Sequence, residues 1–343
     1  MNNNLILYNI HSQKNNITMD PVLLDIQNLD VSFVKPEKSA HALRGMDLTI
    51  ESGEIHALVG ESGSGKTVTS MGIMGLIPMP PGRINAGRIV FKGTDLTGLS
   101  QAKMRKIRGR QIGMVFQEPA RYFNPSLKIG EQIVEMLMLH LGLDKKKAID
   151  QALSFLDVAG MVRSRRVLNS YPHELSGGMK QRAMIAMAIC CHPALLIADE
   201  PTTALDVTLQ RQILQLIRDL KKQFDMGILF ISHNLGIVRE IADRISVIYA
   251  GRIVESAPLN AFFDHTRHPY TRALLRSIPS AKKRGQRLQA ISGQVPDAEN
   301  IPPGCSFHPR CRQAETVCRR EMPPTISYGN GHQAACHMID AHE

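Results

Sequence analysis

The chain contains no tryptophan, and aromatic residues make up only 5% of its 343 positions. Its basic clusters at residues 103–110, 163–166 and 282–287 contain no aromatic residue, which argues against binding of single-stranded nucleic acid by base stacking. No apolar run approaches the ~20 residues of a membrane-spanning helix. The apolar patch at residues 5–10 lacks the basic start and the cleavage site of a secretory signal. We therefore expect no nucleic-acid partner and no membrane span in this chain.

Basic side chains outnumber acidic ones, which gives the chain a formal net charge of +10 at pH 7. Such an excess favours an anionic neighbour, which could be nucleotide, lipid headgroups or nucleic acid, although a solvated basic surface would give the same count. Residues 1–21 begin with a cluster of asparagines and predict a flexible N-terminal extension. Met19, within this extension, is an alternative start of the protein.

Hydrophobic periodicity predicts that residues 22–280 form an α/β domain. Residues 22–59 alternate as strands do and end in a buried strand at 55–59, and further strands are expected near 82–118, 195–198 and 228–232. Helical periodicity dominates residues 125–170 and 207–224, so we expect a helical insert at about 125–192. Strands that alternate with helices favour a mostly parallel sheet covered on both faces.

A glycine-rich segment at residues 60–67, GESGSGKT, fits the phosphate-binding pattern G-x-x-x-x-G-K-[ST] at every position. Backbone N–H groups of such a loop, and the helix that follows it, attract phosphate oxygens. We expect Lys66 to reach the β and γ phosphates of ATP and Thr67 to offer its hydroxyl to Mg²⁺. An ordinary glycine-rich turn is the alternative, which the flanking strand and helix disfavour. The residues expected to bind the nucleotide are Gly60, Glu61, Ser62, Gly63, Ser64, Gly65, Lys66 and Thr67.

Two adjacent carboxylates, Asp199 and Glu200, close the apolar strand at 195–198. A carboxylate at this place can hold Mg²⁺ through a water molecule, and its neighbour can polarise the water that attacks the γ-phosphate. We assign the first role to Asp199 and the second to Glu200. The alternative is a pair of strand-end carboxylates that face solvent.

The order of these motifs resembles the ATP-binding subunit of ABC transporters over residues 22–251. The resemblance rests on GESGSGKT, Gln117, LSGGMKQR at 175–182, LLIADEP at 195–201, ALD at 204–206 and His233. It implies a P-loop ATPase with a mostly parallel core sheet, an antiparallel β subdomain and a helical insert. It also implies a head-to-tail dimer with ATP between the subunits. Ser176, Gly177 and Gly178 would then grip the γ-phosphate bound by the partner.

The same resemblance implies roles for four further residues. Gln117 would sense the γ-phosphate, take part in Mg²⁺ binding and contact the membrane subunit, and His233 would be a catalytic switch residue at the γ-phosphate. Asp206 would couple the two nucleotide sites. Phe33 would stack on adenine, although it fits a core strand residue equally well.

A narrower resemblance, to dipeptide and oligopeptide importers, is carried by YPHELSGGM at 171–179, ADEPTTALDVTLQ at 198–210, HPYTRALL at 268–275 and PPGCSFHPRC at 302–311. It implies an ATPase that energises peptide import from the cytoplasmic face of the inner membrane, as a peripheral protein. The implied partners are a second, different ATPase subunit, two permeases and an extracytoplasmic substrate-binding protein. The loop ARYFNP at 120–125 departs from the more usual MTSLNP, which leaves the cargo open.

Two alternatives to peptide import remain at this stage. A nickel or metallophore importer would share the same ATPase motifs. A soluble ABC ATPase acting on nucleic acid is disfavoured, because one cassette is present and the segment between Lys66 and Ser176 holds only a short helical insert.

The six cysteines fall into two groups. Cys190 and Cys191 lie in an apolar helical stretch and are expected to be core thiols. The other four lie in the proline-rich segment 281–343, which we expect to be a separate small unit with little regular structure. In a reducing compartment four such thiols favour a zinc site or an iron–sulfur cluster over disulfides, with four free thiols as the alternative and His308 and His337 as substitute ligands. The family resemblance favours a [4Fe–4S] cluster on Cys305, Cys311, Cys318 and Cys336.

Overall fold

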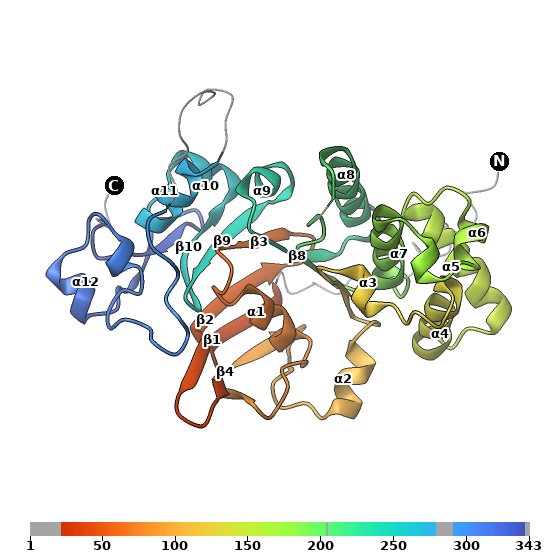
Figure 1. Cartoon of the computed structure of the whole chain (residues 1–343), viewed down its shortest axis with the longest axis horizontal. Coiled ribbons are helices and arrows are strands. Elements are labelled where there is room, and N and C mark those ends of the chain that lie inside the picture. Colours follow the sequence, from red (N-terminus) through yellow and green to blue (C-terminus); the bar gives the residue numbers. More distant parts are fainter. Residues whose placement is uncertain (1–21, 204, 279–290, 340–343) are drawn as a thin grey trace.

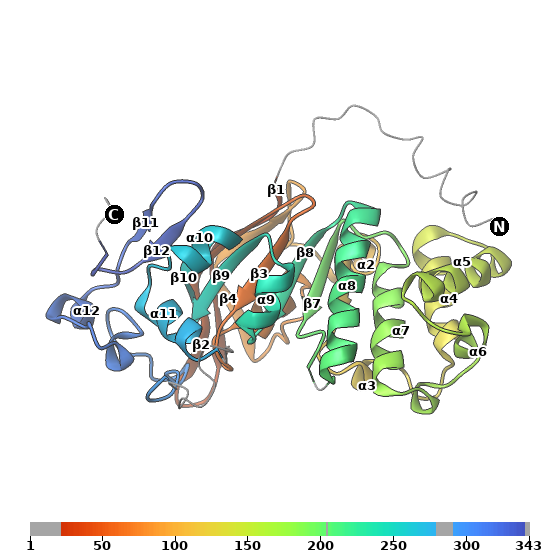
Figure 2. The ribbon, with the colours of Figure 1, turned by 90° about the horizontal axis from the view of Figure 1, so that it is seen from above.

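The computed structural model describes residues 22–203, 205–278 and 291–339. Two sheets form its centre, one of eight strands and one of four. The helices between residues 129 and 189 lie at one end of the long axis, and the cysteine-containing tail lies at the other (Figures 1 and 2). The expected extension 1–21 and the segment 279–290 lie outside the described residues, so the predicted domain boundaries stay predictions.

The eight-stranded sheet has the order β11-β12-β10-β9-β3-β8-β7-β6. Its central pairings, from β9 to β6, are parallel, and the pairings of β10, β11 and β12 are antiparallel. This arrangement confirms the predicted α/β fold. The strands are β3 (Ile55–Val59), β6 (Ile112–Val115), β7 (Leu195–Asp199), β8 (Gly227–Ser232), β9 (Arg244–Tyr249), β10 (Arg252–Pro258), β11 (Thr325–Ser327) and β12 (Gln333–Ala335).

The second sheet is antiparallel, with the order β2-β1-β4-β5. It packs with α1 against one face of the larger sheet, as the expected antiparallel subdomain. Its strands are β1 (Val22–Val34), β2 (Ser39–Glu51), β4 (Gly82–Phe91) and β5 (Thr94–Asp95).

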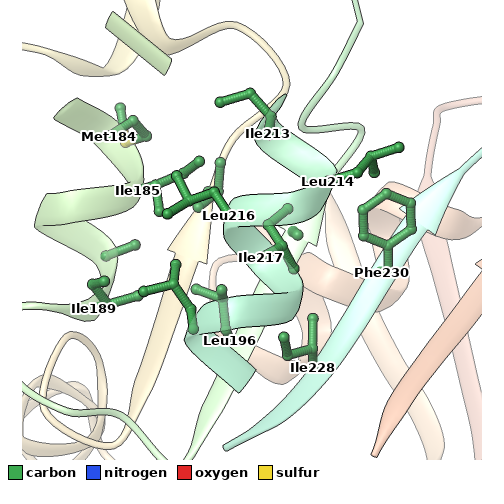
Figure 3. Close-up of a cluster of buried hydrophobic side chains, with 14 of the residues drawn as sticks. Met184, Ile185, Ile189, Leu196, Ile213, Leu214, Leu216, Ile217, Ile228 and Phe230 are labelled. Carbon is green, nitrogen blue, oxygen red and sulfur yellow. The ribbon is translucent and has the colours of Figure 1, made fainter. Parts of the chain in front are cut away.

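The central strands are apolar throughout because both faces of the sheet are covered. In β7, Leu195 and Ile197 belong to the core shared with the antiparallel sheet, whereas Leu196 and Ala198 belong to the core under the helices. Figure 3 shows the second core, where side chains of β7 and β8 meet those of α7 and α8. The residues drawn there include Leu196, Ile228, Phe230, Ile185, Ile189, Ile213 and Ile217.

Four helices, α4 to α7, form the insert, and the remaining helices lie along the sheets and the tail. The insert consists of α4 (Ile129–Leu141), α5 (Lys145–Val158), α6 (Ser164–Leu168) and α7 (Gly177–Ile189). The other described helices are α1 (Lys66–Ile73), α2 (Gln101–Ile107), α3 (Pro119–Tyr122), α8 (Val207–Phe224), α9 (Leu235–Ile241), α10 (Leu259–Asp264), α11 (Pro269–Arg276) and α12 (Thr316–Arg320), with 3₁₀ turns at Pro172–Glu174 and His308–Arg310.

The tail is joined to the main domain more closely than its composition suggested. Its hairpin of β11 and β12 extends the large sheet, because Glu255 and Ser256 of β10 pair with Ala334 and Gln333 of β12. The unpaired edge of β10 can accept a short antiparallel partner, and such a strand is too short to produce a clear periodic pattern in the sequence.

Candidate nucleotide site

The phosphate loop joins β3 to α1, and close packing requires its glycines. A Cβ on Gly60 would lie 2.4 Å from the carbonyl oxygen of Ile248. Gly65 has φ +113°, and a Cβ there would lie 2.9 Å from the carbonyl oxygen of Ala42. The backbone of the loop therefore packs closely against β9 and β2. At both positions only glycine fits without strain.

Lys66 is buried at the start of α1, where its side chain turns back over the loop. Its Nζ donates hydrogen bonds to the carbonyl oxygens of Gly60 (2.8 Å) and Glu61 (2.9 Å). Burial lowers the pKa of Lys66, against the opposing effect of Glu200, Asp199 and Glu61. Three carboxylates thus act electrostatically on one ammonium group. The neighbouring Thr67, the expected Mg²⁺ ligand, is exposed.

Asp199 lies at the end of β7 and is only 5% exposed. The hydroxyl of Ser70 donates a hydrogen bond of 3.3 Å to its Oδ2. Burial raises the pKa of Asp199 to about 6, although Ser70 and Lys66 act in the opposite direction. Sequence reasoning missed Ser70, yet its position four residues after Lys66 puts both side chains on one face of α1, which was an available signal.

Glu200 is the centre of a hydrogen-bonded cluster. Its Oε1 lies 3.0 Å from Nδ1 of His233, and its Oε2 accepts hydrogen bonds from Nε2 of Gln117 (3.0 Å) and the hydroxyl of Thr203 (2.9 Å). Burial alone would raise the pKa of Glu200, but the hydrogen bonds from His233 and Thr203 lower it. The three residues predicted to be catalytic therefore meet at one carboxylate, together with Thr203, which the sequence reasoning did not single out.

The backbone of Glu200 is held in an uncommon conformation. Its φ is +46°, in the left-handed region, and its N–H donates a hydrogen bond of 3.0 Å to the carbonyl oxygen of Ile231. Such a conformation in a residue other than glycine costs of order 1–3 kcal/mol and is frequent at functional sites. The turn directs the carboxylate of Glu200 toward Gln117 and His233.

The other predicted nucleotide residues lie apart from this cluster. Ser176 caps α7, its hydroxyl accepting a hydrogen bond of 3.4 Å from the N–H of Met179. Asp206 caps α8 in the same way, through the N–H of Leu209 (2.9 Å). Gly178 leaves no room for a side chain, because a Cβ would lie 2.3 Å from Cδ2 of Leu209. The described structure therefore places Ser176 and Gly177 at an exposed helix start, with Gly178 buried against Leu209, on a different element from the phosphate loop.

Phe33 lies in β1 and is partly buried against the core of the antiparallel sheet. It pairs with Ala40 of β2 and Gly82 of β4. Both of its expected roles, adenine stacking and core packing, are compatible with this position, so the first stays a prediction.

The four tail cysteines line one small pocket of about 10 Å³, together with His308 and His337. Burial raises the pKa of Cys305, Cys311 and Cys336, in the last case to about 11, and the neighbouring thiols add to the effect. Within residues 22–203, 205–278 and 291–339, however, no group of three or more His, Cys, Asp or Glu has the arrangement of a metal site. The predicted [4Fe–4S] cluster and its zinc alternative therefore gain no support from the coordination geometry.

Comparison with known proteins supports the class that the fold and the loop define. The family model described as ABC transporter matches residues 43–203. A dimeric post-hydrolysis structure of the ATP-binding cassette MJ0796, bound to ADP and phosphate, superposes with a TM-score of 0.62 at 27% identity, covering 69% of this chain and 98% of that one. The chain is an ATP-binding cassette of the ABC transporter class.

The relatives narrow this class. The model described as Oligopeptide/dipeptide transporter, C-terminal region, matches residues 254–318. The oligopeptide transport ATP-binding protein AppD of Bacillus subtilis is 46% identical over 93% of this chain and 97% of AppD. The dipeptide transport ATP-binding protein DppD of the same organism is 44% identical over 93% of this chain and 95% of DppD. This chain belongs to the oligopeptide/dipeptide family of ABC transporter ATP-binding proteins.

The class also fixes the basic chemistry, which is ATP hydrolysis with ATP and Mg²⁺ as the bound species. None of the helices in the described part of the chain has both the length and the apolar character needed to cross a bilayer.

Proposed function

We propose that this chain hydrolyses ATP to energise the import of dipeptides or oligopeptides, as one subunit of an ABC importer. The observation that carries the proposal is the meeting of Gln117, Thr203 and His233 at Glu200, next to a phosphate loop in a chain whose relatives are peptide transport proteins. A carboxylate held in this way, with a lowered pKa, stays ionised at neutral pH and can accept a hydrogen bond from an attacking water.

Each residue of the site has a proposed task. The N–H groups of the loop and Lys66 hold the phosphates, with Lys66 exchanging its carbonyl partners for phosphate oxygens. Thr67, Gln117 and Asp199 hold Mg²⁺, which would neutralise charge on the phosphates. Glu200 orients the attacking water, and His233 contacts the γ-phosphate. Phe33 stacks on adenine.

A second ATPase subunit completes the site. Ser176, Gly177 and Gly178 begin a 13-residue helix, α7, whose N-terminal N–H groups favour an anion. Their separation from this chain's own Lys66 supports action on the nucleotide of a partner, with Asp206 near the contact between the two sites. We propose a different ATPase chain as that partner.

The remaining partners are two permeases and an extracytoplasmic substrate-binding protein, with this chain bound peripherally at the cytoplasmic face of the membrane. Exposed apolar side chains on and before the helical insert support a permease contact: Tyr122, Leu139 and Val162 are 53%, 75% and 81% exposed. Tyr122 stacks on Phe116 with ring centroids 3.8 Å apart, close to Gln117. A permease bound there would lie beside the residue that contacts Glu200.

For the tail we propose a thiolate metal centre on Cys305, Cys311, Cys318 and Cys336, supported by the gathering of the four thiols at one pocket. The donor set suits a [4Fe–4S] cluster or Zn²⁺. A pocket of about 10 Å³ holds about one water, so a cluster needs the thiols to move apart. Iron, sulfide and zinc analysis of the anaerobically purified chain separates the two, and absence of all three contradicts the proposal.

The function is tested with the importer reconstituted in vesicles, with its binding protein and a mixed peptide library. We expect ATP turnover to rise with peptide, and Glu200→Gln to lower turnover by about 10²- to 10⁴-fold while MgATP binding persists. Glu240→Gln, which removes the charge of an exposed carboxylate on α9, is the control. Turnover that responds to nickel complexes but not to peptides would contradict the cargo. Unchanged turnover in Glu200→Gln would contradict the catalytic assignment.

A further inference from the structure

The C-terminal tail contacts the nucleotide domain at the phosphate loop itself. Arg310 precedes Cys311, and its two terminal nitrogens lie 2.9 and 3.0 Å from the two carboxylate oxygens of Glu61. Glu61 is the second residue of the loop. A forked pair of this kind fixes orientation as well as charge. Residues 249 positions apart in the sequence are thus held together at the site that binds ATP.

The guanidinium of Arg310 is itself held in place. Its Nε donates to the carbonyl oxygen of Ser292 (2.9 Å), and a terminal nitrogen donates to the hydroxyl of Tyr249 (3.4 Å). It lies over the rings of Tyr249 and Phe307, 5.8 and 6.0 Å from their centroids. The side chain of Arg310 is only 5% exposed. This arrangement differs from that of a surface ion pair, which is mobile and contributes little.

Glu61 is held from a second side by the main domain. Its N–H donates a hydrogen bond of 3.1 Å to the hydroxyl of Tyr270 in α11, and its carbonyl oxygen accepts one from Lys66. The rings of Tyr270 and Phe307 lie 5.3 Å apart. Glu61 is therefore fixed by three groups, of which Arg310 is the one that pairs directly with its carboxylate.

That carboxylate presents an electrostatic problem. Glu61 is close enough to Lys66 to influence the pKa of its ammonium group, and a polyphosphate bound to the loop would meet the same negative charge. Like charges at short range cost binding free energy. A cation that pairs with Glu61 removes this repulsion and keeps the carboxylate turned toward the tail.

We propose that Arg310 is a positioning residue of the phosphate loop, through which the C-terminal tail sets the affinity for nucleotide. It acts through Glu61 and does not touch the reacting atoms. The inference rests on nucleotide binding by the loop and not on the identity of the cargo or on the presence of a metal in the tail.

The test is a double-mutant cycle on the full-length chain, with Mg²⁺ and a non-hydrolysable ATP analogue titrated by calorimetry. The variants are Arg310→Ala, Glu61→Gln and the pair combined. Arg312→Ala, an exposed arginine change two residues along the tail, is the control. We expect Arg310→Ala to weaken binding of the analogue about tenfold, with more effect on the KM for ATP than on kcat in the assembled importer.

The combined variant distinguishes charge neutralisation from simple docking of the tail. If Arg310 acts by neutralising Glu61, removing the charge of Glu61 in the Arg310→Ala background restores much of the lost affinity. Equal binding by Arg310→Ala and the native chain would overturn the inference, as would a combined variant that binds as weakly as Arg310→Ala. Failure of the native chain and of Arg312→Ala to bind the analogue would instead contradict the proposed function.

Discussion

Asp199→Asn should stabilise the nucleotide-free chain while destroying its use of Mg²⁺. Burial raises the pKa of Asp199 from an ordinary value of 3.8 to about 6. An increase of this size corresponds to about 3 kcal/mol. The ionised carboxylate of Asp199 destabilises the folded state by this amount at neutral pH. Asparagine keeps an oxygen that can accept the hydrogen bond from Ser70 and carries no charge to bury.

The sign of the pH dependence follows from linkage. Between pH 4 and pH 6 the folded chain retains a proton that the unfolded chain has released, so stability falls as the pH rises through this window and levels off above it. The gain from Asp199→Asn should therefore be about 1 kcal/mol at pH 4.5 and about 3 kcal/mol at pH 7.5. For a chain of this size the second value corresponds to a rise of roughly 3–5 °C in Tm.

Thermal and urea unfolding at both pH values measures this gain, without nucleotide or divalent cations. Asp219→Asn removes an exposed carboxylate from α8 and serves as the control, with little change expected. In parallel, Mg²⁺ should no longer strengthen ATP binding to Asp199→Asn. Equal stability of Asp199→Asn and the native chain at pH 7.5, or a gain of the same size at both pH values, would refute the argument from burial.

Two further changes test the loop and the shared site. Gly60→Ala places a Cβ 2.4 Å from the carbonyl oxygen of Ile248, so we expect a loss of about 1–3 kcal/mol in stability and of nucleotide binding, measured by unfolding and calorimetry; native-like binding would contradict the packing argument. Ser176→Ala should lower turnover at the partner's site about 10²-fold while the Lys66 site of the mutated chain still binds labelled nucleotide. Loss of label from that Lys66 site alone would show that Ser176 acts within its own chain.

The parts of the site that were predicted from the sequence are those encoded in short contiguous segments. The phosphate loop has its glycines, its lysine and its flanking strand and helix within one stretch, and Asp199 and Glu200 directly follow a strand. Gln117 and His233 follow β6 and β8, the two strands on either side of β7, and the carboxyl ends of parallel strands meet along one edge. The meeting of these residues at Glu200 is therefore a consequence of the parallel sheet that the alternation of strands and helices already indicated.

The contacts that were not predicted differ in how far a local pattern encodes them. The spacing of Ser70 from Lys66 on α1 was an available signal. Thr203 is a small hydroxyl residue, of a kind that also caps helices and turns, so its sequence context does not single it out. The pairing of Arg310 with Glu61 depends on the contacts of the tail with Tyr249 at the end of β9, and the cysteines near Arg310 favoured a metal-binding interpretation of this segment. Long-range ion pairs of this kind become visible only when both partners are placed in space.

The charges around Lys66 explain why this site depends on groups supplied from outside the loop. Glu61, Asp199 and Glu200 all act to raise the pKa of Lys66, against the effect of burial. The proposed binding site for an anionic polyphosphate therefore contains three carboxylates and one ammonium group. Two of these carboxylates, Asp199 and Glu200, have the proposed tasks of holding Mg²⁺ and orienting the attacking water, and Mg²⁺ would offset their charge. Glu61 has neither task, and its charge must be cancelled by something else. Within the described structure Arg310 forms that ion pair, which makes the tail part of the electrostatics of nucleotide binding.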